Sequence, residues 1–167
     1  MKKSKITMIV VLAMLTAVEI VLSRLLSISL PTFKLSFSFL AVAFAAREYG
    51  PWGGAAVGAA GDLIGALLFP IGPYFPGFTL TAGLCGIVYG VCYRYYSPFI
   101  TLVAEVINNF ILGAGLNTLW LMVFFDNTLA ALLPVRLLQA VISTAVGTVL
   151  LILMEKYVPH INAAKKQ

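Results

Sequence analysis

Charged residues are scarce in this sequence. Only 10% of its 167 residues are Asp, Glu, Lys or Arg, whereas 61% are hydrophobic, and the mean hydropathy is +1.01. A soluble domain usually has about a quarter of its residues charged. The shortage of charge therefore excludes an ordinary soluble domain, and the long apolar runs indicate an integral membrane protein.

Residues that serve catalysis or metal binding are equally scarce. The single histidine, His160, lies in the C-terminal tail, so the apolar runs hold no histidine base of the kind that an intramembrane serine protease needs. Cys85 and Cys92 lie ~10 Å apart along the axis of one expected helix, which is too far for a disulfide. We therefore expect no disulfide, no metal site and no cofactor.

Motifs of ATP hydrolysis and acyl transfer are missing as well. The sequence contains no G-x-x-x-x-G-K-[ST] phosphate-binding loop, no G-x-S-x-G elbow and no H-E-x-x-H pair. The acidic residues Glu19, Asp62 and Glu105 are not spaced as a proton relay. We therefore predict that the chain is not an enzyme and that it serves binding or transport.

The apolar runs predict a compact all-α bundle of six membrane spans, forming a single domain over residues 1–167. Because one span takes ~20 residues, six spans leave little chain for a soluble domain. The expected spans are roughly 6–23, 35–50, 51–69, 78–95, 98–125 and 129–154.

The distribution of lysine predicts the orientation of the bundle. Lysines cluster at both ends of the chain, as Lys2, Lys3, Lys5, Lys156, Lys165 and Lys166. Basic residues are enriched on the cytoplasmic side of membrane proteins, so we expect both termini in the cytoplasm, which requires an even number of spans.

Three basic residues, Arg24, Lys34 and Arg136, then fall on the outer half of the bundle, against the general rule. Snorkelling to lipid phosphates could account for any one of them. Three together favour the capture of an anionic molecule from outside, and arginine is suited to bidentate contact with a carboxylate.

Asp62 is an acidic residue within the third expected span. A carboxylate at that depth is costly unless it is paired, and it usually faces a cavity or a partner. Either an ion pair between helices or a contact with a ligand would account for it. The second interpretation is favoured because Asp62 shares the outer half with the basic residues.

The fifth expected span carries several polar residues. Asn117 and Trp120 are three residues apart and can present an amide and an indole to one site, so we predict that both contact a ligand. The alternatives are an interfacial aromatic for Trp120 and interhelical hydrogen bonding for the asparagine. For Asn108 and Asn109, interhelical hydrogen bonding is favoured.

Small residues indicate close helix packing in two places. Ala13 and Ala17 form a small-xxx-small pattern in the first span. The third span contains glycines for which we expect tight packing and no chemistry, namely Gly53, Gly54, Gly58 and Gly61.

The segment FPIGPYFPGFTLTA, Phe69–Ala82, joins the third and fourth spans with three prolines, four aromatic residues and no charge. Loops between spans are ordinarily polar. The longer run DLIGALLFPIGPYFPGFTLTAGLCGIVYG, Asp62–Gly90, resembles the substrate-binding S components of energy-coupling factor (ECF) vitamin transporters, and it is most similar to the folate-specific members.

This resemblance implies a six-helix protein of the bacterial plasma membrane that binds a vitamin near the outer surface. It also implies partners, a transmembrane coupling protein and two ATPases, with Ala13 and Ala17 at the interface with the coupling protein. The vitamin would be delivered inward by rotation of the whole S component in the membrane.

For the ligand, the resemblance implies folate beneath a stiff uncharged lid. The rings of Phe69, Tyr74 and Phe75 would cover the flat heterocycle. Asp62 would accept paired donors from the pterin, and Arg24 or Arg136 would meet the glutamate tail. Which arginine meets which end of the ligand stays open.

Three alternatives stay open at this point. The vitamin could be thiamine, riboflavin, pantothenate or a queuosine precursor, although the positive outer charge and the number of rings favour folate. A self-sufficient secondary transporter would show a clearer internal repeat. A structural subunit without a ligand would use its polar groups only to hold helices together.

Overall fold

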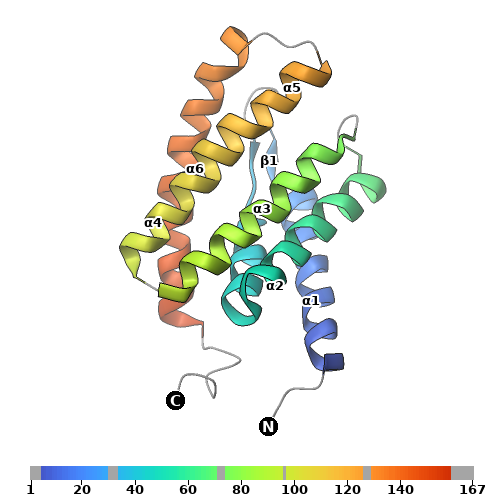
Figure 1. Cartoon of the computed structure of the whole chain (residues 1–167), viewed down its shortest axis with the longest axis vertical. Coiled ribbons are helices and arrows are strands. Elements are labelled where there is room, and N and C mark those ends of the chain that lie inside the picture. The colour runs from blue at the N-terminus through green and yellow to red at the C-terminus, as the bar shows by residue number, and fades with distance from the viewer. Residues whose placement is uncertain (1–4, 30–33, 71–73, 96, 126–128, 159–167) are drawn as a thin grey trace.

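The computed structural model of the protein describes residues 5–29, 34–70, 74–95, 97–125 and 129–158 (Figure 1). His160 and four of the terminal lysines lie outside these residues. Among the described side chains, Cys85 and Cys92 are free thiols.

Helices account for nearly all of the described chain (Figure 1). In chain order, the elements are α1 (Lys5–Ile20), the π-helix η1 (Val21–Leu25), β1 (Ile28–Ser29), β2 (Lys34–Leu35), α2 (Phe39–Leu68), α3 (Pro76–Cys92), the 3-10 helix η2 (Tyr93–Tyr95), α4 (Pro98–Val106), the π-helix η3 (Ile107–Leu116), α5 (Asn117–Phe125) and α6 (Leu129–Tyr157).

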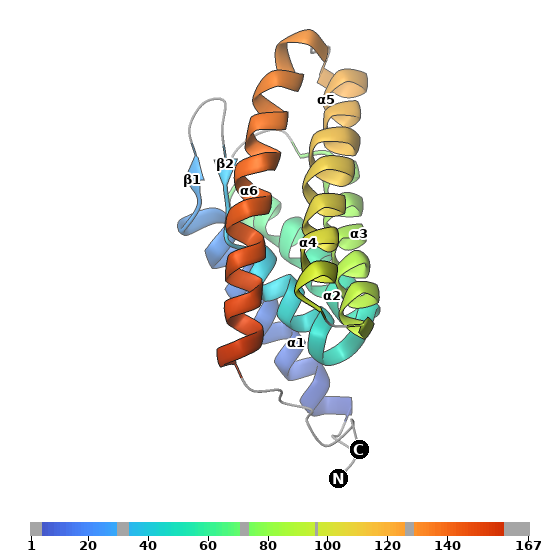
Figure 2. The same ribbon diagram turned by 90° about the vertical axis from the view of Figure 1, so that its left-hand side faces the viewer.

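The short hairpin of β1 and β2 differs from the all-α expectation. The strands are antiparallel, with Ile28 opposite Leu35 and Ser29 opposite Lys34. The local sequence SISL alternates polar and apolar residues, as strands do, and Pro31 follows, which cannot continue a regular helix. The hairpin lies beside α6 when the molecule is seen from the side (Figure 2).

Four helical segments in the described part of the chain are long and apolar enough to cross a membrane: Lys5–Leu25, Pro76–Tyr95, Pro98–Val123 and Leu133–Tyr157. The third of them runs through α4, η3 and α5. These segments support the expected membrane protein, whereas the count of six spans stays a prediction.

Helix α2 is not among these segments, and it is bent. At Gly50 the backbone has φ 78° and ψ −171°, a conformation that residues with a side chain rarely adopt. Pro51 then begins the second leg, where its missing N–H is tolerated. The legs are about 17 and 27 Å long, each less than the ~30 Å hydrocarbon core.

Helices α2 and α3 pack closely through small residues, as the glycine pattern predicted. A Cβ atom at Gly54 would lie 2.6 Å from the carbonyl oxygen of Gly86, and one at Gly58 would lie 2.5 Å from that of Ala82. Neither position can accept a side chain unless the helices move apart. The close approach places the second leg of α2 and the first turns of α3 side by side.

The lower end of the bundle in Figure 1 holds the beginning of α1, the end of α6 and the bend of α2. Near that bend, Arg47 forms ion pairs with Glu48 (3.2 Å) and with Glu155 of α6 (3.8 Å). All three side chains are almost fully buried. The end of α2, the start of α3, the end of α5 and the start of α6 lie toward the opposite, upper end of Figure 1.

Candidate functional site

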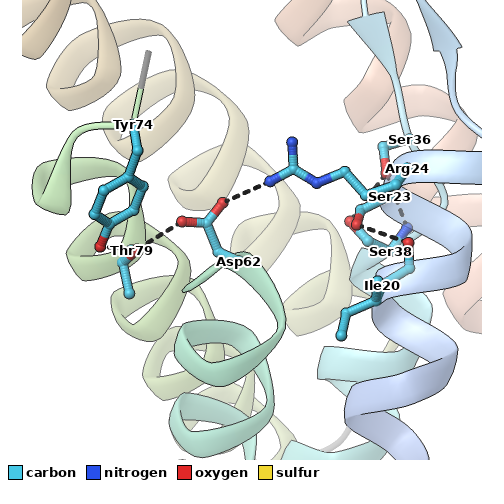
Figure 3. Close-up of polar contacts among 8 residues, drawn as sticks. All are labelled: Ile20, Ser23, Arg24, Ser36, Ser38, Asp62, Tyr74 and Thr79. Carbon is cyan, nitrogen blue, oxygen red and sulfur yellow. Dashed lines mark hydrogen bonds and ion pairs between the residues drawn. The ribbon is translucent and has the colours of Figure 1, made fainter. Parts of the chain in front are cut away.

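Arg24 of η1 and Asp62 of α2 form an ion pair (Figure 3). Arg24 Nη2 is 3.7 Å from Asp62 Oδ1, and the Thr79 hydroxyl donates a hydrogen bond of 2.7 Å to Asp62 Oδ2. Both carboxylate oxygens therefore already have a partner. This arrangement agrees with the ion-pair interpretation of Asp62 and leaves it less able to accept paired donors from a pterin.

Tyr74 extends this chain of contacts toward the loop before α3. Its hydroxyl oxygen is 3.1 Å from Thr79 Oγ1. Because the single hydroxyl proton of Thr79 is donated to Asp62, Tyr74 is the donor in this bond. The contacts from Tyr74 through Thr79 and Asp62 to Arg24 thus connect α3, α2 and η1 (Figure 3).

The hairpin of β1 and β2 is connected to η1, the π-helix that carries Arg24. The Ser36 hydroxyl is 3.4 Å from the carbonyl oxygen of Leu22 in η1. It is also 3.0 Å from the Ser38 hydroxyl (Figure 3). Lys34 lies in β2, and its side chain is outside the described part of the structure.

Three aromatic rings from α5, the start of α3 and its N-cap form a second group of contacts. Phe75 lies 5.6 Å from Trp120 and 6.0 Å from Phe78, measured between ring centroids. The indole of Trp120 donates a 3.2 Å hydrogen bond to Thr81 Oγ1. Of the three lid rings predicted from the sequence, only Phe75 joins this group: Tyr74 contacts Thr79, and Phe69 is 44% exposed.

Asn117 and Arg136 both line a cleft of about 110 Å³ between α6 and the continuous helical rod formed by η3 and α5. We call it the outer cleft. Its lining consists of Asn109, Gly113, Ala114, Asn117, Arg136, Gln139 and Ala140. Within the described residues, Arg136 has no carboxylate partner, in contrast to Arg24. The outer cleft therefore combines an uncompensated cation with carboxamide groups.

Asn117 and Trp120 do not share one site as expected. Asn117 faces α6 across the outer cleft, whereas Trp120 contacts Phe75 and Thr81. Residues three apart on an α-helix differ by about 60° in direction. Because this rod lies between α3 and α6, that difference is enough to give the two side chains different neighbours.

A second cavity, of about 200 Å³, lies nearer the start of η3, and we call it the inner cavity. Its lining consists of Glu19, Ser38, Phe39, Val42, Gly58, Ala82, Cys85, Tyr89, Asn108 and Asn109. Asn109 lines both the outer cleft and the inner cavity. The two spaces are therefore neighbours along η3.

The expected interhelical hydrogen bonding is wrong for Asn109. Its Nδ2 donates to the backbone oxygen (3.0 Å) and to the carboxylate (2.8 Å) of Glu105, four residues earlier in the same rod. The interhelical bond comes instead from Tyr89 of α3, whose hydroxyl donates to Glu105 Oε1 at 2.5 Å. Glu105 is 1% exposed and has these donors as partners.

Several residues around the site were missed by the sequence analysis, namely Phe78, Thr79, Thr81 and Gln139. Gln139 could have been predicted from the sequence, because it follows Arg136 by three residues and so lies on the same side of α6. Thr79 and Thr81 could not have been predicted in this way, because a threonine hydroxyl in an apolar helix most often bonds the backbone of its own helix.

The described part of the chain contains no group of three or more His, Cys, Asp or Glu residues that could hold a metal ion. Ala13 and Ala17 are exposed on α1. They are therefore open to a partner helix and do not pack inside the bundle.

Comparisons with known proteins identify the family to which the chain belongs. Residues 7–155 match the family model of the ECF transporter, substrate-specific component. The folate transporter FolT of Clostridium novyi (strain NT) is 30% identical over 164 residues, which cover 97% of this chain and 95% of that protein. FolT of Leuconostoc mesenteroides subsp. mesenteroides is 34% identical over 119 residues, covering 70% of this chain and 64% of that protein.

Two solved structures are similar in fold. The crystal structure of FolT bound with folic acid has a TM-score of 0.79 and 31% identity, covering 86% of this chain and 90% of that chain. The S component of a bacterial ECF transporter has a TM-score of 0.66 and 18% identity, covering 94% and 100%. The family resemblance of the segment Asp62–Gly90 is thus confirmed, and the chain belongs to the substrate-specific components of ECF transporters.

Proposed function

We propose that this chain is the folate-binding component of an ATP-driven vitamin importer and that it captures folate on the outer side of the bacterial plasma membrane. The observation that carries this proposal is the outer cleft, where uncompensated Arg136 lies beside Asn117 in a chain 30% identical to a folate transporter. The structural similarity to FolT bound with folic acid supports the same ligand.

The chemistry of folate suits the groups that line the upper half of the bundle. Folate joins a flat heterocycle and an aminobenzoate ring to a glutamate with two carboxylates. Trp120 and Phe75 can stack against a ring, and Arg136 can pair with a carboxylate. A cationic vitamin such as thiamine would be repelled by Arg136.

The contacts of the two arginines indicate which of them meets the glutamate tail. Arg24 is paired with Asp62, so most of its charge is already compensated. Arg136 lines an open cleft and has no such partner among the described residues. We assign the tail to Arg136 and give Arg24, Asp62 and Thr79 the role of connecting the loops around the entrance.

Transport requires partners, because this sequence has no nucleotide-binding loop. We propose docking on a transmembrane coupling protein that is joined to two ATPases, as in the family. The exposed Ala13 and Ala17 on α1 would allow close approach of a helix of the coupling protein.

The proposed topology has six spans and both termini in the cytoplasm, with the two legs of α2 as separate spans that are shorter than the average hydrocarbon core. The beginning of α1 and the end of α6 lie at the same end of the bundle, which supports it (Figure 1). Cysteines introduced by Lys3→Cys and Gln167→Cys, in a Cys85→Ser/Cys92→Ser background, should react with a membrane-impermeant maleimide only in inside-out vesicles. Labelling of one terminus from each side would contradict this topology.

Folate titration of the purified chain in detergent, followed by tryptophan fluorescence, tests the proposed function. We expect saturable quenching near stoichiometric folate that is lost in Trp120→Phe, because Trp120 and its neighbour Phe75 are the rings that we propose to stack against folate. The matched control Trp52→Phe should keep the signal, since Trp52 is 81% exposed on α2.

Two other outcomes of this titration would change the conclusion. Saturation by riboflavin, pantothenate, thiamine or a queuosine precursor, with no response to folate, would keep the family and replace the ligand. No response of the folded protein to the whole panel would reject the binding function.

A further inference from the structure

We infer that Glu105 and Tyr89 form a proton-binding site inside the bundle, in which the carboxyl group of Glu105 is held as the neutral acid. The ligand of this site is a single proton. The inference goes beyond the proposed function, because folate binding gives no role to Glu105.

The first observation is that Glu105 is buried without a cation. It is only 1% exposed, within one of the segments long and apolar enough to cross a membrane. Other carboxylates of the bundle lie close to an arginine, as Asp62 does to Arg24 (3.7 Å) and Glu155 to Arg47 (3.8 Å). Among the described residues, Glu105 forms no ion pair. Burial disfavours the charged form of a carboxyl group, so one without a cation takes up a proton.

The groups that face Glu105 from the neighbouring elements do not supply a positive charge. On α3 they are Tyr89 and Cys85, a phenol and a thiol that are ordinarily neutral at neutral pH. On α6, Gly147 lies against the carboxyl group and has no side chain. The cation of η2, Arg94, is exposed and forms no ion pair within the described residues.

The packing around Glu105 excludes a metal ion in place of the proton. A Cβ atom at Gly147 would overlap Glu105 Oε2, so the backbone of α6 lies directly against this oxygen. A space between α3 and α4, with Tyr89, Thr101 and Ala104 in its lining, is too small to hold a water molecule. A metal ion bound by one carboxylate needs several more oxygen ligands or waters, whereas a proton needs none.

The hydrogen bonds around Glu105 can accommodate the acid. The Tyr89 hydroxyl oxygen lies 2.5 Å from Oε1, and Asn109 Nδ2 donates to Oε2 at 2.8 Å. A protonated Oε1 would donate to the Tyr89 oxygen, and the Tyr89 hydroxyl would turn to Asn108, which lies beside it. Neither amide atom of Asn108 makes a hydrogen bond of good geometry within the described residues, so its carbonyl oxygen would gain a donor.

Tyr89 also connects the site with the inner cavity. Tyr89, Asn108 and Asn109 line that cavity, whereas Glu105 lies behind them and does not. We therefore assign proton exchange to the Tyr89 hydroxyl. Tyr89 gives its proton to Glu105 Oε1 and takes one from a hydronium ion in the cavity. Tyr89 is thus unchanged, the carboxylate gains one proton, and a water molecule remains.

Infrared spectroscopy of the purified chain at neutral pH tests the inference, without folate and in a detergent that has no carbonyl group. A protonated carboxyl group has a C=O stretching band that a carboxylate lacks. We expect this band in the wild type and its loss in Glu105→Gln. The matched control Glu155→Gln should keep the band and lose carboxylate absorption instead, because Glu155 is paired with Arg47.

Tyr89→Phe gives a second measurement that keeps Glu105 itself. The acid loses its hydrogen-bond partner in this variant, so its band should persist and shift to higher frequency. A wild type without the band, a band that survives Glu105→Gln, or a band that does not move in Tyr89→Phe would overturn the inference. The folate titration decides the proposed function separately, because it follows Trp120 and the infrared band follows Glu105.

Discussion

Replacement of Arg136 by Gln should lower the affinity for folate by about 10- to 100-fold and leave the affinity for pteroate nearly unchanged. A hydrogen bond to a charged group contributes ~1.5–3 kcal/mol, and each ~1.4 kcal/mol is a factor of ten in affinity. Only folate carries the glutamate that Arg136 is proposed to bind. Isothermal titration of both ligands to the wild type and the variant measures the difference.

Two further arginines serve as comparisons for Arg136→Gln. Arg94 is exposed in η2, outside the site, so Arg94→Gln should bind both ligands normally. Arg24→Gln removes the cation that compensates Asp62 and should weaken folate and pteroate together. If Arg24→Gln abolished the preference for folate while Arg136→Gln kept it, the tail would lie at Arg24.

The second large effect concerns the crossing of α2 and α3. Gly54→Ala should lower the free energy of unfolding by about 1–3 kcal/mol, because its Cβ would lie 2.6 Å from the Gly86 carbonyl oxygen and 2.7 Å from Ala46 Cβ. The helices would have to separate to accommodate it. Thermal unfolding in detergent, followed by circular dichroism, measures the loss.

Gly83→Ala is the matched control on the same pair of helices. A Cβ at Gly83 would make only ordinary contacts, 3.5 Å from Ala59 Cβ and 3.8 Å from the Ala55 carbonyl oxygen. Alanine is the better helix former by ~1 kcal/mol, so this variant should be as stable as the wild type or more stable. Equal destabilisation by both substitutions would show that the close crossing is not what makes Gly54 necessary.

The contacts around Asp62 show how one residue connects three segments of the chain. Asp62 connects Thr79 at the start of α3 with Arg24 on η1, and Tyr74 extends the connection to the loop above α3. The hairpin is bonded to η1 through Ser36. These segments are therefore held to one π-helix, which fixes their positions relative to one another.

Much of the fold could be predicted because it depends on local properties of the chain. Apolar runs identify membrane helices through their length and hydropathy. Glycines spaced along α2 predict a close helix crossing, because only a missing side chain permits it. The hairpin was missed because two-residue strands are too short to produce a pattern that differs from a loop.

The contacts within the candidate site were harder to predict from the sequence. The sequence indicated that Arg24, Asp62 and Arg136 would lie on the outer half, but the choice of partner depends on how each helix is rotated about its axis. That rotation follows from packing against neighbouring helices. The sequence does not reveal this rotation, and it led us to expect Asp62 to face a ligand. In the structure, Asp62 is instead paired with Arg24 and bonded to Thr79.

Composition and the spacing of apolar residues were thus sufficient to identify a helical membrane protein, and the segment Asp62–Gly90 was sufficient to indicate its family. Both properties are carried by residues close together in the chain. Only the tertiary structure decided that Arg24 is compensated while Arg136 is open to a cleft, and that Asn109 lines both that cleft and the inner cavity. Those properties depend on distances between helices that are remote in sequence, and such distances are set by the packing of the whole bundle.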